Sequence, residues 1–413
     1  MIDIMSGVLL ASAYPLESGQ MHSKQSGRYE VVQTLPKETD SAANMFTYAR
    51  VEGNLRMAYI HNSYAARHNG ALSVGGRFGF HTASYHGVNL HVNATTSQRI
   101  GLLNPSSSEH TLAHDFFDAR GESFTYLSHA NVQYNSTNVS LKAGRLNLNT
   151  PYLDADDIRM AANSFEGVSL SYRSGTNVTL NALYVTRWAG YDSGEDQHKF
   201  TPLTPDGSGV GALGMTYMPD DEHSASLWYY HADAMNHILY AEYSGHYNIA
   251  DDFHIEYGVQ GSYMAAIENS QVEGIVVGAM GIVDYGPMFL GLSYNRASIN
   301  ENQYITNGFG GGPYYTSLDE ATLGALSENA VGEDVMAYRV GVGYEVKSMG
   351  LVIEGVYGNL RSRHNEVNMK ESDLILTYAL NAAVLVKASV MSYHMHDGSR
   401  DFKRGMVRVE YNF

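Results

Sequence analysis

The segment VMAYRVGVGYEV, residues 335–346, alternates between two kinds of side chain along its whole length. One face carries Met336, Tyr338, Val340, Val342, Tyr344 and Val346. The other face carries Ala337, Arg339, Gly341, Gly343 and Glu345. Successive side chains of a β-strand point to opposite faces, so this period of two predicts a strand with one apolar face.

The same alternation recurs along most of the chain. It is clear in FTYARVEGNLRMAYI, residues 46–60, and in the closing GMVRVEYNF, residues 405–413. No stretch of useful length follows the helical period of 3.6. We count about 18 predicted strands: 46–60, 71–84, 87–98, 122–135, 137–149, 165–174, 177–189, 209–219, 222–234, 236–249, 253–267, 272–285, 288–299, 335–347, 350–363, 366–379, 381–396 and 403–413.

The connections between these strands differ in length. Short turns alternate with connections that are often much longer, namely 99–121, 150–164, 190–208 and 300–334. A soluble β-sandwich would give the same alternation of faces but has no reason to segregate long and short connections. The even strand count and the loop asymmetry favour an all-β fold, a closed antiparallel transmembrane β-barrel over residues 46–413, wide enough for an aqueous lumen.

The composition excludes several classes of protein. The formal net charge of −17 argues against nucleic-acid binding, which needs a basic surface. The absence of cysteine excludes disulfides and thiolate metal sites. No run of about 18 apolar residues exists, so a transmembrane helix is not expected, whereas a barrel strand needs only about 10 residues with one apolar face.

Residues 1–45 form a polar N-terminal extension outside the predicted barrel. Its apolar run Ile4–Leu10 precedes Ala11-Ser12-Ala13, which is typical of the end of a secretory signal, but a basic region before the run is missing. Both a signal remnant and an ordinary tail therefore stay open.

The segment GRLNLNTPYLDADDIRM, residues 144–160, gathers charge directly after a predicted strand. Asp154, Asp156, Asp157 and Arg159 follow Thr150-Pro151. An EF-hand loop starting at Asp154 would need Gly and Glu where Arg159 and Phe165 stand, and no nucleophile motif accompanies the acids. Two alternatives remain: a solvated surface loop, or a charged segment that lines an opening through which something passes.

The stretch Leu141–Tyr172, LKAGRLNLNTPYLDADDIRMAANSFEGVSLSY, resembles the OprD-like outer-membrane porins, and the final Tyr411-Asn412-Phe413 is similar to the aromatic end of many outer-membrane barrels. The resemblance implies an 18-stranded barrel in the bacterial outer membrane, in contact with membrane lipid and lipopolysaccharide. It also implies that Phe413 is read by the barrel assembly machinery and that the acidic segment folds into the lumen. The pore constriction would then comprise Arg145, Asp154, Asp156, Asp157 and Arg159.

The resemblance further implies a ladder of basic residues along one lumen wall that guides carboxylates. Four arginines lie on predicted inward faces: Arg50, Arg56, Arg339 and Arg408. Ordinary lumen solvation, or pairing with Glu52, Glu345 and Glu410, is the alternative.

We therefore predict a porin that passes small hydrophilic solutes, such as amino acids, small carboxylates or peptides, by passive diffusion, without enzymatic activity, cofactor or metal. The alternatives are a general, weakly cation-selective porin and, from other classes, a barrel protease or lipase, or an adhesin. A zinc site at His110, His114 and Asp115 is a weaker possibility, and the Gly-rich 308–315 reads as a flexible loop. The protein is expected to be a monomer or a loose homo-oligomer.

Overall fold

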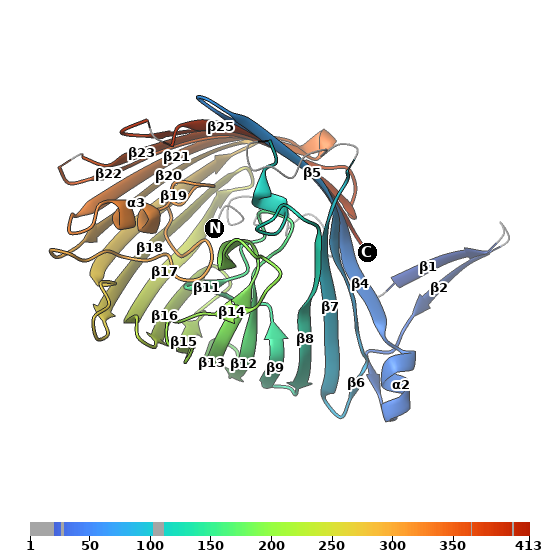
Figure 1. Cartoon of the computed structure of the whole chain (residues 1–413). Helices are drawn as coiled ribbons and strands as arrows, with labels where there is room; N and C mark the ends of the chain where they lie inside the picture. Colours follow the sequence, from blue (N-terminus) through green and yellow to red (C-terminus); the bar gives the residue numbers. More distant parts are fainter. Residues whose placement is uncertain (1–19, 26–28, 102–110, 365, 399) are drawn as a thin grey trace.

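The fold is that of a computed structural model, in which residues 20–25, 29–101, 111–364, 366–398 and 400–413 are described. Eighteen long strands form one closed antiparallel barrel, in which each strand pairs with the next and β25 pairs with β4 (Figure 1). In chain order they are β4 (Arg50–Tyr64), β5 (His68–His81), β7 (Val88–Arg99), β8 (Phe124–Asn135), β9 (Val139–Leu146), β12 (Ser164–Ser174), β13 (Val178–Ala189), β15 (Val210–Tyr217), β16 (His223–Ala232), β17 (Asn236–Ala250), β18 (Phe253–Ala266), β19 (Gly274–Tyr285), β20 (Met288–Ser298), β21 (Val335–Val346), β22 (Leu351–Ser362), β23 (Asn368–Ala379), β24 (Val384–Met395) and β25 (Phe402–Asn412).

The remaining elements are short. β1 (Gln20–Gln25) and β2 (Tyr29–Thr34) form a two-stranded sheet of their own, as do β10 (Asn149–Thr150) and β11 (Leu153–Asp154). Three two-residue strands join the barrel wall: β3 (Glu38–Thr39), β6 (Ser84–Tyr85) and β14 (Thr201–Pro202). The helices are α2 (Ala42–Thr47) and α3 (Leu323–Asn329), with the 3-10 turns η1 (His114–Phe116), η2 (Tyr191–Ser193) and η3 (Lys347–Met349). None of the described helices has the length and apolar character that crossing a membrane would need.

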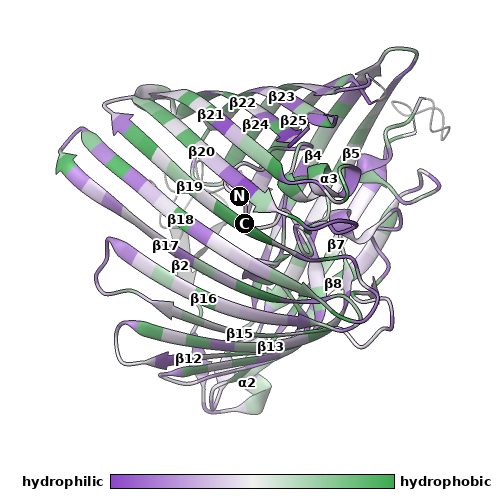
Figure 2. Cartoon of the chain, turned by 90° about the vertical axis from the view of Figure 1, so that its left-hand side faces the viewer, coloured by the Kyte–Doolittle hydropathy of each residue, from purple (hydrophilic) through white to green (hydrophobic). Residues whose placement is uncertain are grey.

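The outer face of the barrel is apolar and is edged by tyrosine. Figure 2 shows hydrophobic and hydrophilic residues alternating along the strands. Exposed tyrosines near the short turns are Tyr134, Tyr172, Tyr217, Tyr247, Tyr285, Tyr344 and Tyr411. Exposed tyrosines toward the long connections are Tyr59, Tyr184, Tyr229, Tyr263, Tyr294, Tyr338 and Tyr357. Two aromatic girdles around an apolar band are typical of a barrel in a lipid bilayer, and they account for the high tyrosine content.

The interior of the barrel is partly filled. Two long connections, 147–163 and 299–334, enter it, and Figure 1 shows α3 within the ring of strands. Their buried apolar side chains pack with those of the wall into one cluster, which includes Tyr152, Leu153, Ile305, Leu318, Leu323 and Leu326 from the loops and Val185, Tyr230, Ile238, Val276 and Leu360 from the strands. On β22, Gly358 provides the space for this contact, since a Cβ there would lie 2.1 Å from Leu318 Cδ1. The two connections therefore pack on the wall from β12 to β24.

These observations confirm the predicted all-β, closed antiparallel barrel of 18 strands with an inserted loop. Several strand boundaries differ from the prediction by a few residues, and two of the differences have a visible cause. The first barrel strand begins at Arg50 rather than 46, because α2 occupies residues 42–47 and buries Met45. The strand predicted over 137–149 ends at Leu146, because Asn149 and Thr150 pair with Asp154 and Leu153 instead. The possible signal remnant within residues 1–19 lies outside the described residues.

Candidate functional site

The two inserted connections pair with each other inside the barrel. Residues 147–163, here called the acidic loop, link β9 to β12, and residues 299–334, here called the helical loop, link β20 to β21. Asp154 N donates to Phe309 O at 3.0 Å, and Phe309 N donates to Tyr152 O at 2.9 Å. The backbone of one loop thus positions the other, and the two form one insert.

Glycine in the helical loop permits this close approach. Gly308 and Gly310 have φ values of 82° and 131°. A Cβ at Gly308 would lie 2.6 Å from Tyr152 O, and one at Gly310 would lie 2.7 Å from Asp154 O. A side chain at either position would therefore clash with the acidic loop as well as strain the backbone.

The acidic loop reaches the opposite wall through Asp157. Arg56 of β4, 3% exposed, donates Nη1 to Asp157 Oδ1 at 2.6 Å and Nη2 to Asp157 Oδ2 at 2.9 Å. Arg56 also binds Glu410 of β25 at 2.6 and 2.9 Å and Arg159 O at 2.6 Å. Arg408 donates Nη1 to Asp157 O at 2.9 Å. Burial alone would raise the pKa of Asp157, but the Arg56 guanidinium outweighs it and holds that pKa well below its usual range.

A second cluster lies around Arg159, which is fully buried. Its guanidinium binds Asp319 of the helical loop in a bidentate pair at 2.9 and 3.0 Å and lies 4.9 Å from the centre of the Tyr191 ring. Arg404 of β25 binds the same Asp319 at 2.9 Å, and it also contacts Glu320, Asp115 and Asn62. Burial opposes ionisation of Asp319, but the two guanidinium groups lower its pKa well below the usual range.

The acidic loop also contributes to a carboxylate pair that forms no ion pair with any of the residues that the structure describes. Asp156 shares a hydrogen bond with Asp192 of η2, whose Oδ2 accepts from Asn163 Nδ2 at 2.7 Å. Burial, and after it the charges of Asp192 and Asp154, raise the pKa of Asp156 to about 8. Burial raises the pKa of Asp192 as well. The pair therefore retains a proton near neutral pH and gains negative charge as the pH rises.

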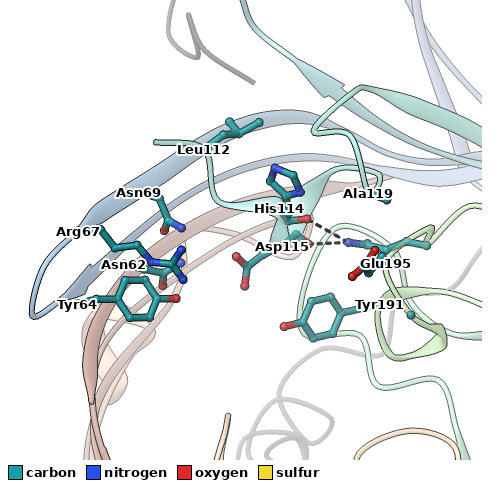
Figure 3. Close-up of a pocket in the computed structure, with 12 residues that line it drawn as sticks. Asn62, Tyr64, Arg67, Asn69, Leu112, His114, Asp115, Ala119, Tyr191 and Glu195 are labelled. Carbon is teal, nitrogen blue, oxygen red and sulfur yellow. Dashed lines mark hydrogen bonds between the residues drawn. The ribbon is translucent and has the colours of Figure 1, made fainter. Parts of the chain in front are cut away.

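Two cavities adjoin these clusters. The larger, of about 430 Å³, opens between the β4–β5 hairpin and η1 and η2 (Figure 3), and it is lined by Asn62, Tyr64, Arg67, Asn69, Leu112, His114, Asp115, Ala119, Tyr191, Gly194, Glu195 and Gln197. The smaller, of about 280 Å³, lies between the acidic loop, η2 and the helical loop, and its lining includes Asp156, Asp192, Asp319 and Glu320. Tyr191 lines both cavities, so they are neighbours.

The charges at this site are predominantly acidic. The cations are Arg56, Arg159, Arg404 and Arg408 in the clusters and Arg67 in the lining of the larger cavity. The carboxylates are Asp115, Asp156, Asp157, Asp192, Asp319, Glu320 and Glu410, with Glu195 in the lining of the larger cavity. Fixed charges of both signs in a confined polar space create a local field and replace part of a solute's hydration shell.

The structure brings some of the predicted residues together and leaves others apart. Asp154, Asp156, Asp157 and Arg159 lie in the insert, and Arg56 and Arg408 contact it. Arg145 does not, because it lies at the end of β9, where it binds Glu166 at 2.9 Å and Leu127 O at 2.7 Å.

The other two predicted basic residues also lie away from the insert's charges. Arg50 donates to Leu35 O at 2.6 Å, and Arg339 lies 3.7 Å from Glu354 on the neighbouring strand.

Several residues of the site were not predicted from the sequence. Arg404 lies on the same face of β25 as Arg408, so the alternation that singled out Arg408 applied to it equally. Asp192, Asp319 and Glu320 lie in connections without periodicity, and no sequence signal marked them. Asp115 was considered only as part of a possible zinc site. Glu371 of β23 was missed as well. It accepts from Ala321 N at 2.6 Å and anchors the helical loop to the wall.

The described residues do not support the predicted zinc site. His110 lies outside them, and Asp115 is engaged by Arg404 and Arg159. In the part of the chain that the structure describes, Asp220, Glu222 and His223 form the one group with suitable atoms within 4.8 Å, and Asp220 Oδ1 already pairs with His223 Nδ1 at 2.8 Å.

Comparisons with known proteins give one family and a consistent set of structures. The family model described as outer membrane porin, OprD family, matches residues 74–298. No curated protein matches the chain. Acinetobacter baumannii OccAB2 is 14% identical with a TM-score of 0.75, covering 90% of this chain and 99% of that one. Pseudomonas aeruginosa OccK9 (OpdG) is 15% identical with the same TM-score and coverage. Pseudomonas aeruginosa OpdK with vanillate is 14% identical with a TM-score of 0.71, covering 88% and 98%.

Proposed function

The chain belongs to the OprD family of outer membrane porins, and on this premise we propose that it passes small hydrophilic solutes by passive diffusion and favours those that carry a positive charge. The resemblance seen in Leu141–Tyr172 is thereby confirmed. The family and the similar structures are channels of the bacterial outer membrane and not enzymes. Which solutes pass, and with which charge, is the part we propose.

The main support for this proposal is that the arginines of the site already bind carboxylates of the protein itself. All three guanidinium nitrogens of Arg56 donate hydrogen bonds, five in total, to Asp157, Glu410 or Arg159 O. Arg404 is likewise held by carboxylates and Asn62, and Arg159 is fully buried. A solute carboxylate would have to displace an internal carboxylate from a charge-assisted, bidentate contact, which is among the stronger hydrogen-bonded pairs in proteins. These arginines are therefore poorly suited to guide anions.

The surplus of acid supports the same conclusion. Asp156 and Asp192 line the smaller cavity with no arginine bound to either side chain among the described residues. Each unpaired carboxylate at about 7 Å in water attracts a cation by about 0.6 kcal/mol, or about threefold in local concentration. A protonated amine therefore gains from this passage, whereas a carboxylate is repelled.

The position of the insert limits the path that a solute can take through the barrel. The insert packs against β12–β24 and is also bound by Arg56 of β4 and Arg404 of β25, so it spans the lumen and a solute must pass its charged contacts. A solute would enter the larger cavity, pass the Arg404 and Arg56 clusters and leave past the short turns. Weak, multiple contacts hold and release it, and no covalent step is involved.

Flux through reconstituted liposomes tests the solute class. Labelled lysine, glutamine and glutamate are close in size and differ in charge. We expect entry rates in the order lysine, glutamine, glutamate, and a Asp156→Asn/Asp192→Asn variant should lose at least about threefold of the lysine advantage.

A matched control removes the same charge outside the lumen. Asp251→Asn/Asp252→Asn alters two exposed acids in the short turn after β17 and should leave the order unchanged. Faster entry of glutamate, or of the vanillate found with OpdK, than of lysine would overturn the proposal. Equal rates for all three solutes would instead indicate a general porin.

Phe413 is proposed as the residue that the barrel assembly machinery reads. The residue is 44% exposed, its ring stacks on Tyr411, and its backbone exchanges two hydrogen bonds with Gly53, each of 3.1 Å. A chain ending at Asn412 should reach the outer membrane in lower yield. Because one barrel contains the whole site, we also propose that the monomer is sufficient for passage, with any homo-oligomer being loose.

A further inference from the structure

Cationic side chains collect on the outer face of one part of the barrel, at the rim of the long connections. Arg361 lies on β22, Lys370 on β23 and Lys403 on β25, and all three are exposed. They share the outward parity of the exposed apolar residues Tyr357, Leu374 and Val407 of the same strands. These three residues are here called the outer basic patch.

The strand register holds the patch together. Lys370 pairs with Asn359, and Arg361 pairs with Asn368, so these two cations are one diagonal step apart on neighbouring strands. On β24, His394 is directly opposite Lys370, and Ser392 is directly opposite Lys403. Strands lie about 4.8 Å apart, so the patch spans about 15 Å of rim.

The patch has a fixed depth relative to the apolar wall. Each cation stands four residues from the exposed apolar residue on its strand, with Asn359, Ser372 or Gly405 between them. Four residues of strand rise about 13 Å. On β22 and β23 the side chains change from apolar through polar to cationic, in the same order as the acyl chains and charged headgroups of a bilayer.

These cations lack internal partners. Among the residues that the structure describes, none forms an ion pair with Arg361, Lys370 or Lys403, although the neighbouring His394 pairs with Asp401 at 2.6 Å. The connections above the patch, 363–367 and 396–401, are short. A ligand in the membrane plane can therefore reach the patch without crossing a long loop.

We propose that the outer basic patch binds the phosphate groups of lipopolysaccharide in the outer leaflet. In a chain with a net charge of −17, three unpaired cations at headgroup depth complement an anionic lipid surface. A polyanionic headgroup can engage several of them together. This inference depends on the location of the barrel and not on the solute that it passes.

Binding to purified, delipidated protein tests the proposal. Lipopolysaccharide and its enzymatically dephosphorylated form would be titrated against the protein in detergent and counted by native mass spectrometry. Each cation at an anionic surface contributes about one kcal/mol, so Arg361→Gln/Lys370→Gln/Lys403→Gln should bind the phosphorylated form about a hundredfold more weakly than wild type. Wild type should bind the dephosphorylated form about as weakly as that variant does.

The control variant Lys37→Gln/Arg173→Gln/Lys347→Gln removes the same charge from exposed positions at the short-turn rim and should bind as wild type does. Heat-modifiable migration on gels verifies that each variant is a folded barrel. Unchanged binding by the patch variant, an equal loss in the control, or equal binding of dephosphorylated lipid by wild type would each overturn the proposal.

Discussion

Arg56, Arg159 and Arg404 come from three separate segments, yet all are held by carboxylates of the insert. Desolvating a guanidinium is costly, and removal of one partner from such a buried pair typically costs about 3–5 kcal/mol. The pairs therefore fix the insert against the β4 and β25 wall and at the same time neutralise the arginines. The charge that a solute meets is then decided by the acids left over, chiefly Asp156 and Asp192.

The Asp156–Asp192 pair should make cation selectivity depend on pH. Since burial and the neighbouring acids raise the pKa of Asp156 to about 8, its folded form keeps a proton that the unfolded chain has already released. Selectivity for cations should therefore rise as the pH passes through about 8, while stability falls as the pH rises toward that value from the ordinary carboxyl range.

Reversal potentials recorded on both sides of this pH measure the effect. Asp156→Asn should give a flat profile, because the shared proton no longer exchanges. A wild-type profile that is flat, or that falls with pH, would show that the pair does not face the passage.

Individual residues were predictable only where the backbone is periodic. Arg408 and Arg56 followed from strand parity, and Arg404 shares that parity. Asp319 and Glu320 contact arginines of β25 and the acidic loop across more than 80 residues of sequence. Such contacts depend on how the helical loop folds, and neither composition nor spacing reports that fold.

At the level of elements, the barrel strands could be predicted from the sequence because every second side chain faces lipid. The ends of the strands were harder to predict. β9 stops at Leu146 although the alternation continues, since Leu148 turns inward into the apolar cluster and Asn149 begins the β10–β11 pair. The glycine-rich 308–315 was interpreted as a flexible loop, but it forms backbone bonds with the acidic loop.

Substitution of Gly310 should uncouple the two loops. Gly310→Ala places a Cβ 2.7 Å from Asp154 O at a φ of 131°, and strain of this kind costs roughly 1–3 kcal/mol. We expect a larger and noisier single-channel conductance as the acidic loop loses its support.

Gly311→Ala is the matched control. A Cβ there meets only the Asp156 carboxyl group at 3.5 Å, an ordinary contact, and conductance should stay at the wild-type value. Wild-type conductance in Gly310→Ala would argue that the pairing of the loops does not determine the aperture.

For the whole molecule, the barrel separates three environments by side-chain parity and position. Lipid meets the apolar outer band between two tyrosine girdles, and the outer basic patch lies beyond it. Inside, the insert packs on β12–β24 and is held to the facing wall by Arg56, Arg404 and Arg408. The net charge of −17 was a correct sequence-level indication that acid dominates, but its location depended on the inserted loops.

An acid-lined constriction formed by the two inserted loops should let the barrel conduct ions and should favour cations. Single-channel recording of the purified protein in a planar bilayer under a KCl gradient tests this most directly. We expect discrete conductance steps and a reversal potential of the sign set by potassium, and the Asp156→Asn/Asp192→Asn variant should reduce that potential. The absence of steps from folded protein, or a reversal potential of the sign set by chloride, would contradict this expectation.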